Sequence, residues 1–225
     1  MDDLVRRSLT RTAVFVVILL LLLLLPAGSL RFWQGWMYWA VFSASVVAIT
    51  LYFLRHDPAL IARRLNGGPT AEKQPVQRQI LWFTSAFFVL LFVFPGFDHR
   101  FAWSRVPAHL VIAANVLVVA GFAIVFLTFK ANSYTAAIID VAPEQLLVST
   151  GPYGVVRHPM YAGSLVMLLA TPIALGSWWG LLPALCLVAC IVWRIVAEEE
   201  FLVRHLPGYA EYRQRVRYRL VPGIW

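Results

Sequence analysis

The residues best suited to chemistry lie in the C-terminal third, on either side of a long uncharged run. Gly151-Pro152-Tyr153 and Arg157-His158-Pro159-Met160-Tyr161 lead into that run, and Arg194 and Glu198-Glu199-Glu200 follow it. As a single helix, residues 160–193 would extend about 51 Å, well beyond a hydrocarbon core of about 30 Å. The run must therefore fold back on itself.

A turn in the middle of this run would bring the two polar groups together. Pro172, Gly176, Gly180 and Pro183 lie near its centre, where a tight turn between two apolar helices is easiest to build. Such a hairpin returns the chain to the side that it left. We therefore expect His158 and Glu198 to face each other at one membrane surface.

His158 precedes a proline, which predicts its position at a helix start. Proline suits the first turn of a helix and disfavours helical geometry in the residue before it. Free backbone N–H groups at this end could hold a carboxylate or ribose oxygens. Taken alone, a His-Pro pair at a helix start is often only a cap.

Arg194 and Glu198 are four residues apart, on one face of the predicted second arm. One interpretation is an intrahelical ion pair on a solvated helix end. Against it, an ionisable residue directly after an apolar stretch tends to face a bundle interior or a cavity. Three consecutive acids also cover more than half of the helix circumference, so at least one must face inward. We favour a functional role for Arg194 and Glu198.

The composition indicates the class of protein that holds these residues. Hydrophobic residues make up 60% of the 225 residues and charged residues 13%, which is typical of an integral membrane protein. Strand-like alternation is absent, so we predict an all-α architecture. Four uncharged stretches have about the length of a spanning helix, namely 12–30, 32–54, 79–97 and 106–129.

These stretches divide the chain into two regions. Residues 1–130 are predicted to hold four spanning helices, with a polar loop at 55–78 that contains a short interfacial helix at 58–65. Residues 131–225 are predicted to form the catalytic region, with a cofactor segment, a transmembrane helical hairpin and a polar tail.

The net charge of +8 is distributed unevenly among the loops. Basic residues gather before the first span, between the second and third spans, and after the fourth span and the hairpin. The opposite loops hold only Arg31, Arg100 and Arg105. The positive-inside rule then places both termini and the site segments in the cytoplasm. The basic tail fits contact with anionic membrane lipids better than nucleic acid, so no nucleic-acid partner is expected.

Two features leave alternatives open. Arg6-Arg7, the apolar residues 14–25 and Ala27-Gly28-Ser29 also resemble a secretory signal, although the chain re-enters the membrane almost at once. Cys186 and Cys190 are one helical turn apart without a neighbouring His or carboxylate, so no metal site is expected.

The motifs together resemble a known family. Gly-Pro-Tyr at 151–153, Arg-His-Pro-x-Tyr-x-Gly at 157–163, the apolar hairpin, Glu-Glu-x-x-Leu at 198–202 and Gly-Tyr-x-x-Tyr at 208–212 resemble the isoprenylcysteine carboxyl methyltransferases and their prokaryotic relatives, near the phospholipid methyltransferases. Each motif alone is weak, but their combination and spacing are specific. The resemblance covers residues 132–225.

The resemblance implies a membrane-embedded enzyme that binds S-adenosylmethionine at the cytoplasmic face and takes a lipidic substrate from the bilayer. It assigns catalytic roles to Arg194, Glu198 and His158, and contact with the substrate to Arg194. The implied cofactor contacts are Gln145, Leu146, Leu147, Val148, Tyr153, His158, Pro159, Met160, Tyr161 and Glu198.

Methyl transfer fits this set of residues. An ionised carboxylate is already a nucleophile, so the reaction needs no catalytic triad and no metal. Rate enhancement would come from alignment of acceptor and methyl group and from a fixed Arg194 contact that replaces water. An amine acceptor would instead need a base, for which His158 and Glu198 are the nearest candidates.

Several functions remain open at this point. The acceptor could be a prenylated or other lipidic carboxylate, a phospholipid amine or a small hydrophobic molecule. Arginine strongly outnumbers lysine, which we associate with GC-rich prokaryotes and hence with an inner membrane. Membrane sterol reductases share a His-Pro-x-Tyr segment and use NADPH, but their chains are longer and have extra spans. A non-catalytic scaffold is the remaining alternative, and no obligate protein partner is expected.

Overall fold

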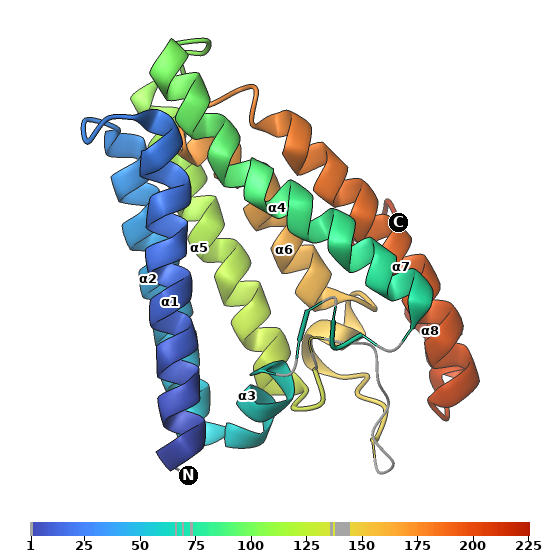
Figure 1. Cartoon of the computed structure of the whole chain (residues 1–225). Coiled ribbons are helices and arrows are strands. Elements are labelled where there is room, and N and C mark those ends of the chain that lie inside the picture. The colour runs from blue at the N-terminus through green and yellow to red at the C-terminus, as the bar shows by residue number, and fades with distance from the viewer. Residues whose placement is uncertain (1, 66, 69, 73, 136, 138–144) are drawn as a thin grey trace.

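The computed structural model describes residues 2–65, 67–68, 70–72, 74–135, 137 and 145–225 (Figure 1). Within these residues the regular structure is helical, and no β-strand occurs. Five helices of this described part are long and apolar enough to cross a membrane. The prediction of an all-α integral membrane protein is confirmed, and the protein is a multi-pass membrane protein.

The four spans predicted before the hairpin are present as long helices. They contain 26, 24, 27 and 24 residues, more than the roughly 20 that a span requires. Their polar ends extend the helices past the apolar stretches, so α1 and α4 start earlier than predicted. The short helix α3 (Pro58–Leu65) has the predicted bounds. The four long helices are α1 (Asp2–Ala27), α2 (Trp33–His56), α4 (Pro75–Phe101) and α5 (Ala108–Ala131).

The predicted hairpin is formed by α6 (Pro159–Ala174) and α7 (Leu181–His205). Gly176 adopts φ 75° in the turn between them, a conformation that favours glycine. Ser177 in the same turn donates a hydrogen bond to the buried Asp98 of α4. The turn is thereby fixed to the end of α4, and the two arms keep a defined register.

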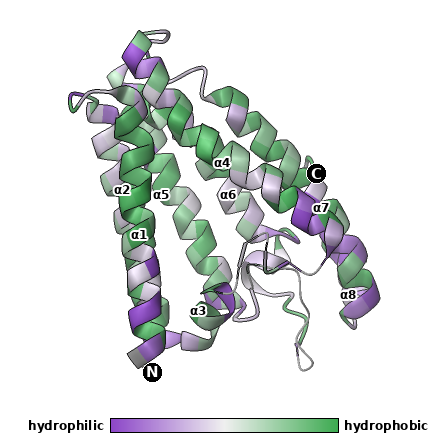
Figure 2. Cartoon of the chain, viewed as in Figure 1, coloured by the Kyte–Doolittle hydropathy of each residue, from purple (hydrophilic) through white to green (hydrophobic). Residues whose placement is uncertain are grey.

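The helices are not parallel over their whole length. Figure 1 shows α1, α2 and α5 grouped together, whereas α4 and α7 run obliquely beside α6. Figure 2 shows apolar residues along the middle of the bundle and hydrophilic residues at the start of α1, around α3, and from the second half of α7 into α8 (Tyr209–Arg215). The polar segments therefore gather toward one end of the bundle, where α6 begins.

A pair of glycines allows α5 and α6 to pack closely. A Cβ atom on Gly121 would lie 2.7 Å from the Gly163 carbonyl oxygen and would overlap Met167. We expect Gly121→Ala to destabilise the protein by about 1–3 kcal/mol, because backbone and side chain would both have to move. Thermal unfolding in detergent measures this effect. Gly154→Ala is the matched control, since its nearest neighbour would be 3.5 Å away, and an equal loss in both variants would contradict the prediction.

Candidate active site

A polar cavity lies at the beginning of α6 and encloses about 840 Å³ of empty space, part of it open to solvent. Residues from the segment 132–135 after α5, the segment 145–148, the 3₁₀ turn η1 (Gly151–Gly154), α6, α7 and α8 line it. All of the predicted site residues line this cavity, namely Gln145, Leu146, Leu147, Val148, Tyr153, His158, Pro159, Met160, Tyr161, Arg194 and Glu198.

Helix lengths explain why these residues meet. The 16 residues of α6 extend about 24 Å, so from the shared turn α6 reaches the level of about residue 196 on α7. The first turn of α6 therefore lies beside the stretch of α7 that runs from Arg194 to Glu198. The remaining two turns of α7 continue beyond the start of α6 and form a wall of the polar cavity.

His158 occupies the predicted position directly before α6, with Pro159 as the first helical residue. Its backbone N–H is not free, because it donates to the Arg219 carbonyl at 3.0 Å. The Arg157 N–H likewise donates to the Tyr218 carbonyl at 2.9 Å. The C-terminal tail therefore occupies the N–H groups of Arg157 and His158, and binding of a carboxylate or ribose oxygens by the N–H groups of the first turn of α6 stays a prediction.

The direct partner of His158 is Glu199. The His158 Nε2 atom lies 3.2 Å from Glu199 Oε1, and Glu199 is 2% exposed. Arg157 binds the same carboxylate through Nε at 2.6 Å and Nη2 at 3.3 Å, and Arg219 binds it through Nε at 2.9 Å. His158 and Glu198 both line the polar cavity, as expected, but the direct contact of His158 is with Glu199, because neighbouring helical residues point about 100° apart.

Glu198 belongs to a second group of contacts, centred on Tyr161. Arg194 Nε donates to the Tyr161 hydroxyl at 2.7 Å, and that hydroxyl donates to Glu198 Oε2 at 2.8 Å. Among the described residues no ion pair within 4 Å joins Arg194 to Glu198. The simple intrahelical ion pair is therefore not what forms; Tyr161 of α6 lies between the two charges and orients both.

Arg194 is held from several sides and yet keeps one unpaired nitrogen. Its Nη2 lies 3.9 Å from Glu72 Oε2 and 3.4 Å from the Ala137 carbonyl oxygen. Its Nη1 is buried and has no hydrogen-bond partner in the part of the chain that the structure describes. Since a buried unpaired donor is costly, this nitrogen indicates where a ligand oxygen can bind.

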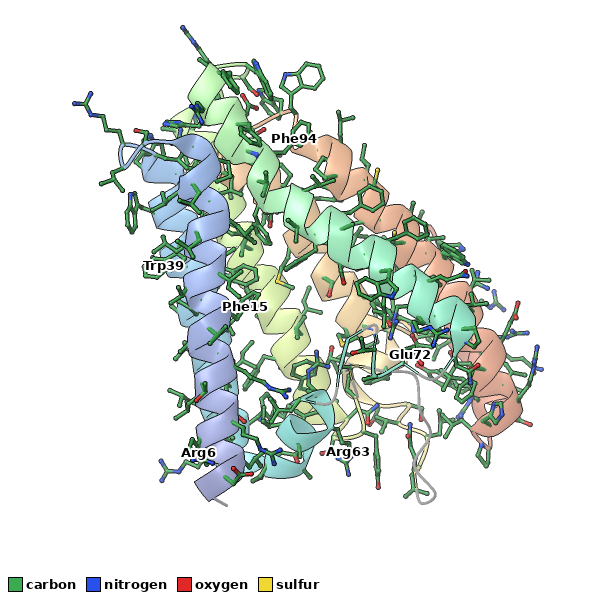
Figure 3. The ribbon with its side chains drawn as sticks, in the orientation of Figure 1. Arg6, Phe15, Trp39, Arg63, Glu72 and Phe94 are labelled. Atoms are coloured by element: carbon green, nitrogen blue, oxygen red, sulfur yellow. The ribbon has the colours of Figure 1, made fainter. Side chains whose placement is uncertain are left out.

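Glu72 was not predicted as a site residue. It lies in the loop before α4, is 3% exposed, and Figure 3 places it beside the start of α4, near the start of α6. The sequence signal for it was that the basic loop 55–78 contains only two acidic residues, Asp57 and Glu72. Its distance from Arg194 along the sequence made the contact impossible to assign.

Tyrosines form the opposite side of the polar cavity. Asn132 donates to the Tyr153 hydroxyl at 3.2 Å, and the Tyr212 hydroxyl donates to the Tyr153 carbonyl at 2.7 Å. Burial raises the pKa of Tyr153 and of Tyr212, so both phenols are neutral at physiological pH. The Tyr209 hydroxyl is buried without a hydrogen-bond partner among the described residues. Together with Arg194 Nη1, it is one of two unpaired polar groups in this cavity that can bind a polar ligand.

A second, apolar cavity adjoins the polar cavity. It contains about 1010 Å³ of empty space, part of it open to the outside, and is lined mainly by apolar side chains of α2, α4, α6 and α7. Met160, Tyr161 and Arg194 line both cavities. The two spaces are therefore neighbours on either side of the Tyr161–Arg194 hydrogen bond, and the polar cavity holds more polar side chains than the apolar one.

Arg64 provides a further cation at this junction and was also missed. It lies at the end of α3, 3.4 Å from the Thr135 carbonyl oxygen, with its guanidinium 4.3 Å from the centre of the Phe129 ring. Burial lowers its pKa to about 10, which still leaves it protonated at neutral pH. No carboxylate of the described residues lies within 4 Å of it. Its side chain lines the apolar cavity.

Comparison with known proteins agrees with the motifs. Residues 110–208 match the family model described as phospholipid methyltransferase. The chain is 35% identical over 79 residues to the protein-S-isoprenylcysteine O-methyltransferase of Schizosaccharomyces pombe, covering 32% of each chain. It is 40% identical over 86 residues to the Delta(14)-sterol reductase of Mus musculus, covering 36% of this chain and 20% of the reductase.

The chain thus spans about a third and about a fifth of the length of these two relatives. The region that matches the family model begins in α5, continues through α6 and α7, and contains every predicted site residue. Residues 110–208 are therefore related to the phospholipid methyltransferases, which supports the family predicted from the motifs.

Proposed function

We propose that the protein is a membrane-embedded methyltransferase that transfers a methyl group from S-adenosylmethionine to a carboxylate of a lipidic acceptor of isoprenylcysteine type. The polar cavity would lie at the cytoplasmic face. One observation carries this proposal: the polar and apolar cavities lie on either side of Tyr161 and Arg194. A water-soluble donor and a lipid can therefore reach one point from opposite sides.

The residues of the polar cavity fit the chemistry of S-adenosylmethionine. Glu198 offers an anionic contact for the cationic donor, since its Oε1 lies outside the hydrogen bond from Tyr161. The unpaired Tyr209 hydroxyl offers a polar contact, and Leu147, Leu202 and Leu206 supply apolar surface. When bound, the cofactor supplies an electrophilic methyl group on a sulfonium.

The protein's own contribution is to hold and orient the acceptor. In the proposal, the unpaired Nη1 of Arg194 binds an acceptor carboxylate oxygen, while Tyr161 fixes the guanidinium through its hydrogen bond to Nε. The apolar cavity keeps water away from the lipid side of this contact. Because the Arg194 guanidinium and the Tyr161 hydroxyl are already held in place, they need little reorganisation during the reaction.

The charges at the junction favour a carboxylate over an amine. Arg64 and Arg194 line the apolar cavity, and the described residues of that lining include no Asp or Glu. Two guanidinium groups attract an anionic acceptor and repel a protonated amine. A carboxylate also needs no general base, whereas a protonated amine must first lose a proton.

A reductase is the second candidate, because the sterol reductase shares 40% identity over 86 residues. NADPH carries several phosphate charges, which proteins commonly bind with arginine or lysine. In the described lining of the polar cavity the Arg and Lys residues are Arg157 and Arg194. Arg157 is already engaged by Glu199 and by the carbonyls of Val216 and Arg217. This arrangement suits a sulfonium cofactor better than a phosphate-rich one.

Calorimetric titration of the protein in nanodiscs distinguishes these candidates. We expect saturable binding of S-adenosylmethionine, competition by S-adenosylhomocysteine and no binding of NADPH. Binding of NADPH alone would support a reductase. Failure of both ligands to bind would leave a non-catalytic membrane protein and overturn the proposal.

A further inference from the structure

A third space, the side cavity, lies at the end of the bundle where α1 begins. It contains about 1180 Å³ of empty space, part of it open to the outside. Residues of α1, α2, α3, α5 and α6 line it. Figure 1 shows α3 and the start of α1 together at this end of the bundle. The side cavity is therefore a space between helices at one surface of the membrane.

Two arginines line the side cavity near α3. Arg11 of α1 donates a hydrogen bond through Nη1 to the carbonyl of Leu65, the residue that follows the second arginine, Arg64 of α3. The described lining of the side cavity includes no Asp or Glu. No carboxylate of the described residues lies within 4 Å of either guanidinium. Two cations without a nearby counter-charge favour an anionic ligand.

The side cavity continues from Arg64 along two apolar helices. The Arg64 guanidinium lies 4.3 Å from the centre of the Phe129 ring and 3.7 Å from the Met160 sulfur. Phe122 of α5 and Met167 of α6 also line the cavity, each seven residues farther into the membrane on the same helix. Seven residues correspond to about 10 Å along a helix axis. The cavity therefore offers an apolar path beside a cationic end, which suits an amphiphile better than a free anion.

The position of the cationic end indicates which amphiphile fits. Figure 2 shows hydrophilic residues around α3 and at the start of α1, the level at which lipid head groups lie. Basic pockets between transmembrane helices at this level bind the head groups of anionic phospholipids. We propose that the side cavity binds one anionic phospholipid of the leaflet that contains α3. Its phosphate would contact Arg11 and Arg64, and one acyl chain would lie along α5 and α6.

This lipid site is distinct from the contact proposed for the methyl acceptor. Arg11 lines the side cavity and is absent from the described lining of the polar and apolar cavities, whereas Arg194 lines those two and is absent from the side cavity. Only Arg64 is a cation of both the side and the apolar cavity in the described linings. The inference therefore does not depend on the proposed function. A lipid bound there would connect α1 and α3 to the start of α6.

Native mass spectrometry of the protein in a neutral detergent tests this site. An equimolar mixture of phosphatidylglycerol and phosphatidylethanolamine with identical acyl chains is titrated into the protein without cofactor. We expect the first bound lipid to be phosphatidylglycerol, with a preference of about tenfold or more, because each arginine contact favours the anion about fivefold. Arg11→Gln and Arg64→Gln should each reduce this preference about fivefold.

Arg6→Gln is the matched control, because it removes the same charge from the same helix. Arg6 is exposed, forms an ion pair with Asp3 at 3.1 Å, and is absent from the described lining of the side cavity. The preference for phosphatidylglycerol should therefore stay unchanged in this variant. An equal loss in the Arg6 and Arg11 variants would show general attraction between a basic surface and an anionic lipid, and would overturn the inference.

Three further results would also contradict a phospholipid site. They are equal affinities for the two lipids, competition by glycerol phosphate at the same concentration, and an Arg11→Gln variant that loses affinity for a prenylated cysteine carboxylate as strongly as for phosphatidylglycerol. The last result would assign the side cavity to the methyl acceptor. If Arg64→Gln does not fold, Arg11→Gln decides alone, since Arg11 is exposed. Because no methyl transfer is measured, an inactive protein that still prefers phosphatidylglycerol would reject the proposed function and retain the lipid site.

Discussion

Replacement of Arg194 by glutamine is expected to lower kcat/KM for a lipidic carboxylate acceptor by about ten- to hundredfold, because one charge-assisted contact contributes about 1.5–3 kcal/mol. The affinity for S-adenosylmethionine should change by no more than about twofold. The reason is positional. Arg194 lies between the two cavities with Nη1 unpaired, whereas most of the predicted cofactor contacts lie on η1, the segment 145–148 and the start of α6.

Two further variants distinguish the effect of the Arg194 charge on the acceptor from a general disturbance of the site. Glu198→Gln should weaken cofactor binding and leave the acceptor response largely intact, because Glu198 binds the opposite side of the Tyr161 hydroxyl. Arg204→Gln should change neither property, because Arg204 is exposed and 3.9 Å from the exposed Glu200. Initial rates at varied acceptor, measured beside cofactor isotherms, provide both readouts. Equal loss of cofactor affinity in the Arg194 and Glu198 variants would show that the pair acts only as a structural unit with Tyr161.

Replacement of Glu199 by glutamine is expected to reduce the free energy of unfolding by about 3–5 kcal/mol, because it leaves the buried Arg157 guanidinium without its counter-charge. Glu199 holds Arg157, His158 and Arg219 together, and Arg157 also donates to the carbonyls of Val216 and Arg217. Loss of the carboxylate should therefore release the C-terminal tail from the start of α6.

The three consecutive acids supply the controls for this prediction. Glu200→Gln should leave thermal unfolding in detergent unchanged, since Glu200 is exposed, and Glu198→Gln should have a smaller effect than Glu199→Gln. Limited proteolysis after residue 205 should be faster in the Glu199 variant alone. Similar unfolding temperatures for the Glu199 and Glu200 variants would contradict a structural role for the buried carboxylate.

The sequence predicted the bundle well because a few strong physical constraints decide it. The apolar stretches had lengths that only membrane spans explain, and residues 160–193 were too long for one span and had turn residues at the centre. The fold-back of α6 and α7 follows from these facts alone. The same argument brought Arg194 and Glu198 to the start of α6, where both line the polar cavity.

Details that depend on helix rotation could not be predicted in this way. The presence of three acids required one to face inward, but the choice of Glu199 is fixed by the packing of α7 against α6. The interposed hydroxyl of Tyr161 was equally invisible, because an i to i+4 spacing of Arg194 and Glu198 also suits a direct ion pair. Register along the helices was predictable, and rotation about their axes was not.

Contacts between loops that are distant in the sequence could not be predicted either. Glu72 reaches Arg194 across more than 120 positions, and Arg64 of α3 lies at the junction of the cavities. Their charges were visible, yet a basic polar loop has an adequate explanation in the positive-inside rule. Only the three-dimensional arrangement distinguishes a cation that lines a cavity from one that faces the lipid headgroups.

The most direct measurement of the central claim follows an isotopic methyl group. Protein in nanodiscs is incubated with S-adenosylmethionine labelled in its methyl group, together with a prenylated cysteine carboxylate and, separately, a phospholipid amine. The account predicts label in the carboxylate lipid, released as methanol by mild base because the product is a methyl ester, and loss of this label in the Arg194→Gln variant. Base-stable label in the amine lipid, or NADPH-dependent reduction of a sterol without any methyl transfer, would contradict it.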